Sequence, residues 1–149
     1  MNILLVNTTK MVGDTGGLAK VTSAFANEMY KRGHTVSVIY ADERSGDFFF
    51  PIDEDIKCYD VRLQNGKRIK YPISLRLKRE FYRLFSKQKA RTVNSDFFYK
   101  YICPYMGRII KGIQPDIIIS FTPGTSKSLI IDLNLQDKVP IITMSHGNP

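Results

Sequence analysis

The sequence predicts an α/β domain with a doubly wound, mainly parallel sheet, and two observations carry this prediction. Asn2–Asn7 (NILLVN) and Thr35–Ala41 (TVSVIYA) are short runs rich in aliphatic and β-branched residues, a composition typical of buried strands. Between them, apolar residues recur at helical spacing from Leu18 to Met29. A strand, a helix and a second strand in this order form a βαβ unit, whose right-handed crossover implies parallel strands.

The first helix has recognisable ends. The double glycine Gly16-Gly17 precedes it, while Lys31 and Arg32 occupy its last turn and Gly33 follows as a stop signal. The rest of the chain continues the alternation of strands and helices. We expect a weak strand over Tyr59–Leu63, a helix over Leu75–Arg91, a helix over Phe97–Ile113 disturbed at Pro104, a strong strand over Asp116–Phe121, a helix over Ser126–Leu135 and a strand over Val139–Ser145.

Length and composition limit the class of protein. A chain of 149 residues with 43% hydrophobic and 24% charged residues forms one globular domain and is not disordered. It has no apolar run of the roughly 18 residues that a membrane-spanning helix needs, and MNILLVN is not a signal peptide. We therefore expect a cytoplasmic protein. Cys58 and Cys103 form no motif, and we expect each to be a buried free thiol.

The net charge of +8 is concentrated in one stretch. Residues 67–91 hold ten Lys and Arg against a single acidic residue, Glu80, whereas acidic and basic residues nearly balance before and after them. A general basic bias for solubility would be spread more evenly, so this segment is a candidate for contact with an anionic partner.

Three loops follow or precede strands on the side where open α/β sheets bind ligands. Gly13–Gly17 (GDTGG) lets the backbone approach a ligand and ends at a helix N-terminus, which attracts phosphate; a flexible turn is the alternative. Thr122–Ser126 (TPGTS) could bind a ligand or cap the next helix, and capping is favoured. His146, after the last predicted strand and before Gly147, is favoured as a functional residue. His34 is expected on the opposite edge as a structural surface residue.

Three runs together resemble signatures of family 4 glycosyltransferases. The run GGLAKVTSAFANEMYKRGHTVSVI is similar to the opening of these enzymes, and QPDIIISFTPGTS and VPIITMSHGNP resemble two later signatures in the right order. The chain departs from the pattern at Lys20, where an arginine is common, and in a longer loop over Thr8–Thr15. The resemblance covers most of this chain but only the first part of such an enzyme.

The resemblance implies a specific architecture and activity. Family members have the GT-B architecture, two Rossmann-like domains that face each other across a cleft. The first domain mainly binds the acceptor and the second binds the nucleotide sugar. We therefore expect residues 1–149 to be a single acceptor-side domain that lacks the C-terminal donor-binding domain and its Glu-x7-Glu motif. The expected reaction is transfer of a sugar from a nucleotide sugar to a sugar, polysaccharide or lipid-linked acceptor, with retention.

The resemblance also assigns roles to residues. Gly16 and Gly17 would lie against the donor diphosphate and the reacting centre, and His146 would be the active-site histidine that contacts the transferred sugar. Thr122, in the loop after the strand predicted over Asp116–Phe121, is a further candidate for binding the diphosphate or substrate. No metal and no cofactor besides the nucleotide sugar are implied. This chain alone is expected to be inactive.

The basic stretch allows three interpretations. Leu77, Phe81, Leu84 and Phe85 form one apolar stripe, which in an average helix would face the core and leave the cations in solvent. A basic amphipathic helix can also lie on an anionic membrane, and this interpretation is favoured because relatives often use lipid-linked acceptors. Contact with the inner face of the cell membrane would then involve a set of cationic side chains: Arg76, Lys78, Arg79, Arg83 and Lys87. Nucleic-acid binding is disfavoured, because stacking by the aromatic residues would compete with core packing.

A different class of function remains as an alternative. The chain could be a complete flavodoxin-like module that binds a nucleotide or phosphate by itself. No acidic cluster follows the first predicted strand, which disfavours a metal-dependent phosphoacceptor domain of the response-regulator kind.

Overall fold

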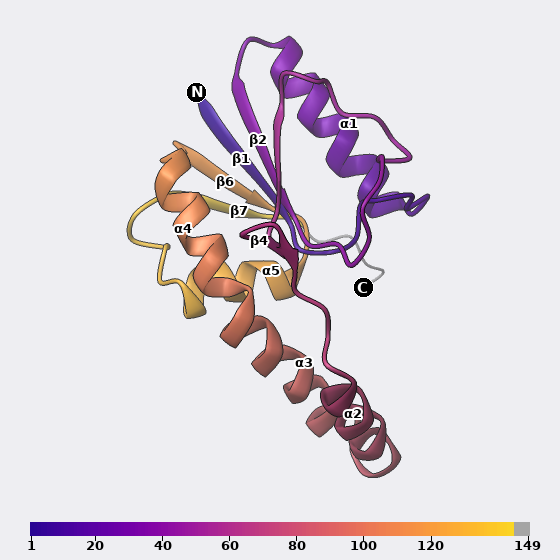
Figure 1. Cartoon of the computed structure of the whole chain (residues 1–149). Coiled ribbons are helices and arrows are strands. Elements are labelled where there is room, and N and C mark those ends of the chain that lie inside the picture. Colours follow the sequence, from indigo (N-terminus) through magenta and orange to yellow (C-terminus); the bar gives the residue numbers. More distant parts are fainter. Residues whose placement is uncertain (145–149) are drawn as a thin grey trace.

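The computed structural model describes residues 1–144, which form one twisted sheet with helices on both faces (Figure 1). The five strands are β1 (Asn2–Asn7), β2 (Thr35–Tyr40), β3 (Lys57–Asp60), β6 (Ile117–Ser120) and β7 (Ile141–Thr143). They are ordered β3-β2-β1-β6-β7, and every neighbouring pair is parallel. The predicted doubly wound α/β fold is therefore confirmed.

Alternation along β1 divides the core into two parts. Ile3 and Leu5 pack on one face, against α1 (Gly17–Lys31). Leu4 and Val6 pack on the other face, in a cluster that includes Met106 of α4 (Cys103–Ile113). Because β1 is covered on both sides, its residues from Ile3 onward are all buried, which explains its continuous apolar sequence.

The chain changes direction across the sheet at β1. From β1 it proceeds through α1 to β2 on one side, whereas β6 is added on the other side of β1. The chain after β1 leads to α1 on one face of the sheet, whereas the chain after β6 leads to helical residues that pack on the other face, such as Leu129. Ligands in open α/β sheets bind at such a switch point.

The helix predicted over Leu75–Arg91 is in fact two helices, and the prediction of one helix is wrong. α2 (Ile73–Phe85) ends at Ser86, whose backbone is extended with φ −160° and ψ 114°. The Ser86 Oγ then accepts a hydrogen bond from the Lys89 backbone N at 3.4 Å and caps α3 (Lys87–Tyr101). Local capping chemistry thus overrides the apolar periodicity that continued across this position.

Other boundaries also differ from the sequence-based expectation. The predicted disturbance at Pro104 is confirmed, because α3 ends at Tyr101 and the proline lies in the first turn of α4. The weak strand predicted over Tyr59–Leu63 is β3, which begins earlier, at Lys57, and already ends at Asp60. A separate hairpin follows it, in which β4 (Leu63–Gln64) pairs antiparallel with β5 (Lys67–Arg68). Asn65 and Gly66 form its turn, with φ values of 52° and 74°, and an Asn-Gly pair favours such turns.

The later elements are shorter than expected. The helix predicted over Ser126–Leu135 is α5 (Pro123–Lys127) followed by the π-helical turn η1 (Ser128–Asp132). Within residues 1–144, the strand predicted over Val139–Ser145 is shorter and consists of β7. Cys103 is buried as expected, whereas Cys58 is exposed, so that part of the expectation is wrong.

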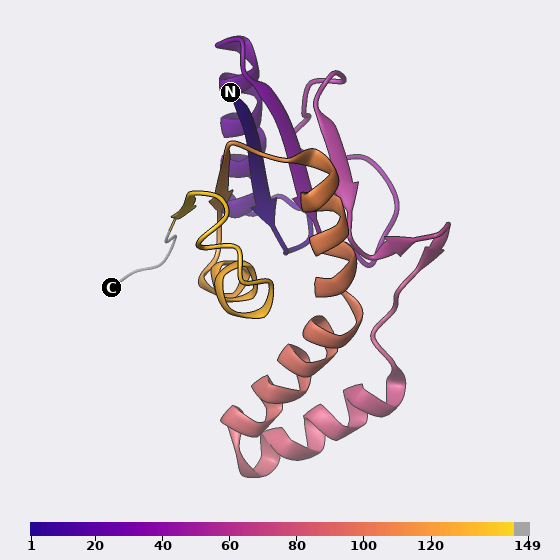
Figure 2. The same cartoon turned by 90° about the vertical axis from the view of Figure 1, so that its left-hand side faces the viewer.

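The α2–α3 hairpin projects away from the sheet (Figure 2). It extends beyond the carboxyl ends of the strands, on the side where the loops after β1 and β6 lie (Figures 1 and 2). Among residues 1–144, none of the helices is long and apolar enough to cross a bilayer.

Candidate functional site

Buried polar side chains lie at the carboxyl end of β1, the central strand of the sheet. Asn7, the last residue of β1, is fully buried, and its Nδ2 donates to Thr22 Oγ1 of α1 at 3.0 Å. The Asn7 Oδ1 accepts hydrogen bonds from Thr9, at 3.2 Å from the backbone N and 2.7 Å from Oγ1. The side chain therefore joins the start of the loop after β1 to the first helix.

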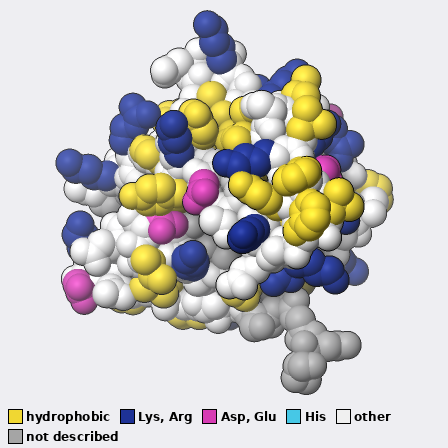
Figure 3. All heavy atoms as spheres, turned by 90° about the horizontal axis from the view of Figure 1, so that it is seen from below, with side chains coloured by type: hydrophobic (Ala, Val, Ile, Leu, Met, Phe, Trp, Pro, Cys, Tyr) yellow, Lys and Arg dark blue, Asp and Glu magenta, His cyan; other side chains and the backbone are white. Residues whose placement is uncertain are grey.

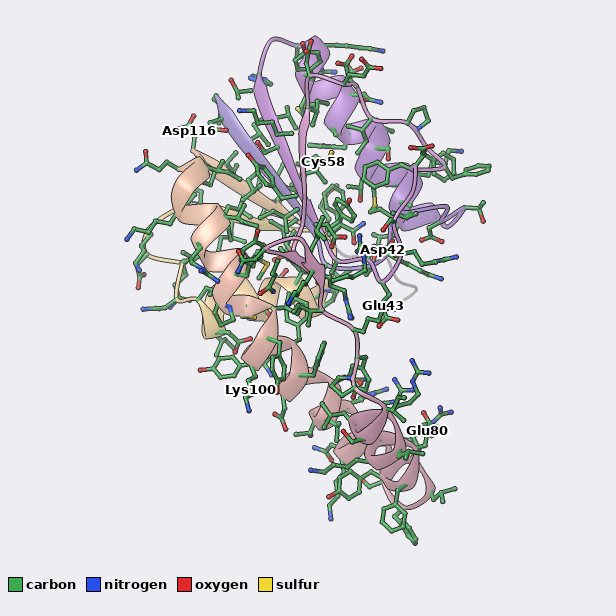
Figure 4. All side chains as sticks on the ribbon, in the orientation of Figure 1. Asp42, Glu43, Cys58, Glu80, Lys100 and Asp116 are labelled. Carbon is green, nitrogen blue, oxygen red and sulfur yellow. The ribbon has the colours of Figure 1, made fainter. Side chains whose placement is uncertain are left out.

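Asp42, two residues after the end of β2, supports the same loop from the other side. Its Oδ2 accepts hydrogen bonds from the backbone N atoms of Met11 and Val12, both at 2.8 Å, and the residue is only 1% exposed. Its Oδ1 accepts from the Arg44 backbone N at 2.9 Å. Figure 4 shows Asp42 near the carboxyl ends of the strands, where the loop passes. These bonds fix the path of the backbone between β1 and α1.

The two glycines stand where the loop enters α1. Gly16 is the N-cap residue in an extended conformation, and no side chain caps the helix. The Gly16 N donates to Asp14 Oδ1 at 3.3 Å, and a Cβ added at Gly16 would lie 3.3 Å from both oxygens of that carboxylate. A Cβ added at Gly17 would have no atom within 4 Å, so this residue borders open space. The first turn can thus offer backbone donors and a positive dipole end to an anion.

Thr122 is part of a cluster of hydroxyl groups at the end of β6. Its Oγ1 accepts from the Thr125 backbone N at 3.1 Å, which caps α5, and lies 2.8 Å from Thr125 Oγ1. The Thr125 Oγ1 also lies 2.6 Å from Thr8 Oγ1 after β1. The cluster therefore joins the loops on the two sides of the switch point, and ligand binding by Thr122 stays a prediction.

The structure brings Gly16 and Gly17 to the same edge of the sheet as Thr122. His146, the predicted catalytic residue, lies outside the described residues. Among residues 1–144, no three His, Cys, Asp or Glu side chains form a group that could hold a metal ion.

The apolar stripe of α2 is exposed to solvent, and the interpretation that it faces the core is wrong. Phe81 and Leu84 are 60% and 80% exposed, and α2 has no fully buried residue. The half-buried side chains of α2 lie instead on its opposite face, which includes Leu75 and Tyr82. Figure 3 views this end of the molecule and shows hydrophobic side chains gathered beside Lys and Arg side chains. Because this stripe does not pack in the core, core packing is no longer an argument against stacking of its aromatic residues on nucleic-acid bases.

Two arginines of α2 form ion pairs with the same carboxylate. The Glu80 carboxylate pairs with Arg79 at 2.8 Å and with Arg83 at 3.0 Å. The hydrogen bond from Arg79 lowers the pKa of Glu80, and Arg83 adds to this effect. Within the described residues, Arg76, Lys78 and Lys87 have no ion pair, although the Lys78 ammonium lies over the Tyr82 ring at 5.8 Å. The hairpin therefore presents an excess of unpaired positive charge.

A large hollow lies away from this edge. It has a volume of about 950 Å³ and is lined at the amino ends of the strands by residues that include Asn2, His34 and Thr35. His34 is thus found on the opposite edge of the sheet, where we expected it. A smaller hollow of about 260 Å³ lies at the carboxyl ends and includes Thr8, Asn94 and Gly124.

Sequence reasoning missed the buried polar residues of this edge. Asn7 is the last residue of an apolar strand and Asp42 follows the next apolar run, and this position in the sequence is the signal that could have identified them. Arg62, Tyr71 and Asn94 line a hollow beside the α2–α3 hairpin. No sequence pattern identifies them, because the hairpin after β3 and the break at Ser86 bring them together in the fold.

The chain resembles known proteins in structure and not in sequence. No protein-family model matches the chain, and no curated protein matches its sequence. Among solved structures, the catalytic domain of starch synthase IV from Arabidopsis thaliana, bound to ADP and acarbose, is similar with a TM-score of 0.54 and 15% identity. The match covers 98% of this chain and 34% of that domain, so the chain spans about a third of the length of its structural neighbour. The likeness concerns the fold alone: this chain has an α/β, Rossmann-like fold that matches part of that catalytic domain.

Proposed function

We propose that this chain is the acceptor-side domain of a glycosyltransferase that uses a nucleotide sugar. The observation that carries the proposal is the position of Gly16 and Gly17 at the uncapped start of α1, beside the switch point of the parallel sheet. The structural likeness to a starch synthase catalytic domain supports it, since that protein was solved with ADP and acarbose bound. A donor-binding domain would face this edge and complete the active site.

The chemistry follows from the residues at the edge. Departure of a nucleoside diphosphate develops negative charge, which the free backbone N–H groups at the start of α1 can stabilise. Gly17 borders open space through which the diphosphate oxygens can approach these groups, whereas the Asp14 carboxylate lies beside Gly16. His146 would position the transferred sugar by a hydrogen bond, without acting as a general base. The expected transfer proceeds with retention and needs no metal.

The test uses a protein in which this chain is joined to its donor domain. We expect release of nucleoside diphosphate from at least one nucleotide sugar, and loss of that activity in Gly17→Ala. Alanine fits the helical backbone at this position and its methyl group enters only open space, so the fold should be unaffected. His146→Ala should also abolish transfer.

The control is Gly112→Ala, because a Cβ there also has no neighbour within 4 Å but lies on α4, near the opposite edge. Full activity in Gly17→Ala or His146→Ala would overturn the proposal. Saturable binding of flavin by the 149-residue chain, with no turnover of any nucleotide sugar, would favour the stand-alone flavodoxin-like module instead.

We also propose that α2 docks on an anionic membrane and that the acceptor is lipid-linked. The exposed apolar stripe of α2 has no partner among the described residues, and the segment that contains it holds ten Lys and Arg against Glu80. Each cation near an anionic surface contributes about 1 kcal/mol of binding, and buried apolar side chains add to it. Charge complementarity therefore favours an anionic lipid surface as the occupant, which would make the protein peripheral at the inner face of the membrane.

Sedimentation with liposomes tests the docking proposal. The chain should bind vesicles with phosphatidylserine at low salt, bind neutral vesicles weakly, and lose binding when Phe81 and Leu84 are both changed to Ser. The matched control changes two exposed apolar residues elsewhere, Tyr99 and Ile131, to Ser. Equal binding of neutral and anionic vesicles, or unchanged binding by the α2 variant, would contradict it. Concentration-dependent self-association that the α2 variant abolishes would identify a second copy as the occupant.

A further inference from the structure

A hollow between α2, α3 and the hairpin after β3 is unusually rich in arginine. It has a volume of about 510 Å³, and its lining includes Arg62, Arg76, Arg79 and the phenol of Tyr71. Glu43 is the only acidic residue in the lining, and Figure 4 shows it between the sheet and the α2–α3 hairpin. Arg62 pairs with Glu43 and Arg79 pairs with Glu80 of α2, so Arg76 contributes the guanidinium group of this hollow that has no ion pair among residues 1–144.

Two of the arginine side chains, those of Arg62 and Arg79, are held in place before any ligand binds. Arg62 donates to the Ile69 carbonyl at 3.2 Å and pairs with Glu43 at 3.1 Å, and its guanidinium lies 5.5 Å from the centre of the Phe97 ring. The Arg79 guanidinium lies 5.6 Å from the centre of the Tyr71 ring. Such stacking restricts the rotamers of both arginines, so little freedom would be lost on binding.

Two donors that belong to this lining lack an acceptor. The Arg62 Nε and the Tyr71 Oη are buried and have no hydrogen-bond partner. Burial raises the pKa of Tyr71, so its phenol keeps the proton with which it can donate. Buried polar groups are normally paired, and an unpaired group calls for an explanation. A ligand that carries several acceptor oxygens would supply what both donors lack once a small shift of the two side chains exposes these atoms to the hollow.

The hollow adjoins the one at the proposed active edge, because Asn94 and Phe98 of α3 line both. Asn94 of α3 lines the arginine hollow and also lines the smaller hollow that contains Thr8 and Gly124 at the carboxyl ends of β1 and β6. A third hollow, lined by Arg79, Arg83, Lys87 and Arg91, also includes Asn94. A ligand bound at the arginines could therefore extend past Asn94 toward the loops at the switch point.

We propose that the hollow of Arg62, Tyr71, Arg76 and Arg79 binds the phosphate or diphosphate group of the acceptor. This inference rests on the proposed transferase function and names the chemical class of its acceptor. Guanidinium groups match phosphate oxygens with paired hydrogen bonds, which explains arginine in preference to lysine around this hollow. The reacting hydroxyl of the acceptor would lie on the Asn94 side, toward Thr8.

Calorimetric titration of the 149-residue chain with inorganic pyrophosphate tests the site. We expect saturable binding with one site, weakened at least tenfold when Arg76 and Arg79 are both changed to Gln. Arg108→Gln removes an arginine that also stacks on a tyrosine, Tyr105, but lies on α4 outside the hollow, so it should bind like the wild type. No saturable binding, or an equal loss in the Arg108 variant, would overturn the proposal. Thermal unfolding of each variant confirms that it is folded.

Two further ligands distinguish the sources of the phosphate. Tighter binding of geranyl diphosphate than of pyrophosphate would assign the site to a lipid-linked acceptor, and preference for glucose 1-phosphate would assign it to a soluble sugar phosphate. Either preference supports a phosphate-bearing acceptor, whereas competition by neither ligand overturns it. Pyrophosphate binding without any nucleotide-sugar turnover would overturn the transferase function alone. Turnover with an unchanged acceptor KM in the Arg76 and Arg79 variant would overturn this site alone.

Discussion

The Asp42 carboxylate lies 2.8 Å from the backbone N of Met11, although the two residues are 31 positions apart in the sequence. The same oxygen accepts a second hydrogen bond, from the Val12 backbone N. Asp42 thereby holds the loop that leads to the double glycine, and its own burial is possible because each carboxylate oxygen is paired.

Changing Asp42 to Ala should therefore destabilise the fold. The substitution leaves buried backbone N–H groups without an acceptor, and we expect the free energy of unfolding to fall by about 3 kcal/mol. Urea denaturation measures it. Asp137→Ala, at an exposed position without a hydrogen bond or ion pair among the described residues, should change stability by less than about 0.5 kcal/mol. Equal stability of the two variants would contradict the role of Asp42.

Ser86 should determine the corner between α2 and α3. Loss of an N-cap hydroxyl costs about 1 kcal/mol, so Ser86→Ala should increase hydrogen exchange of the first-turn amides of α3, that of Lys89 in particular. Ser74→Ala, at an exposed position within α2, serves as the control. Ser86→Asp retains an acceptor and should keep the protection of the wild type. If Ser86→Ala exchanges no faster than Ser74→Ala, the corner does not depend on this cap.

The central part of the fold could be predicted because its signals are local. β1, α1 and β2 were identified from apolar runs, the double glycine and the stop at Gly33, and the structure has all three with nearly the expected ends. The α2–α3 hairpin could not be predicted in the same way. The apolar periodicity from Leu77 to Phe85 does not reveal that this face points to solvent, because that depends on the extended backbone at Ser86.

In the candidate site, too, the residues with local sequence signals could be predicted and those brought together by tertiary packing could not. Gly16, Gly17 and Thr122 were identified because each stands at a predicted element boundary, and the structure places them on one edge. Arg62 and Tyr71 come together with Phe97 only through tertiary packing. No spacing in the sequence encodes such a contact, so a cluster of this kind is visible only in three dimensions.

The hydroxyl group of Tyr71 should reduce the stability of the ligand-free protein. Its oxygen is buried without a partner, whereas its ring packs against Phe97 with centroids 4.8 Å apart. Tyr71→Phe keeps the ring contact and removes the unpaired group, so the free energy of unfolding should rise by about 1 kcal/mol. Urea denaturation should show this gain while pyrophosphate binding weakens. Tyr99→Phe, at an exposed position, should alter neither quantity. A loss of stability in Tyr71→Phe would show that the hydroxyl group is paired.

Tyr40 should make the fold sensitive to high pH. Burial raises the pKa of Tyr40 to about 12, and the neighbouring Asp60 carboxylate contributes in the same direction. The unfolded chain has the ordinary tyrosine pKa of about 10, so ionisation favours the unfolded state between these two values. The stabilising contribution is complete below pH 10 and is lost as the pH rises toward 12.

Comparison of the wild type with Tyr40→Phe isolates this contribution from the other titrating groups. The rings of Tyr40 and Phe48 pack edge to face with their centroids 5.0 Å apart, and phenylalanine at position 40 preserves that contact. Thermal unfolding between pH 9 and pH 12 should therefore show a smaller fall in Tm for Tyr40→Phe than for the wild type, with the difference growing above pH 10. Parallel curves for the two proteins would mean that Tyr40 ionises with an ordinary pKa in the folded state.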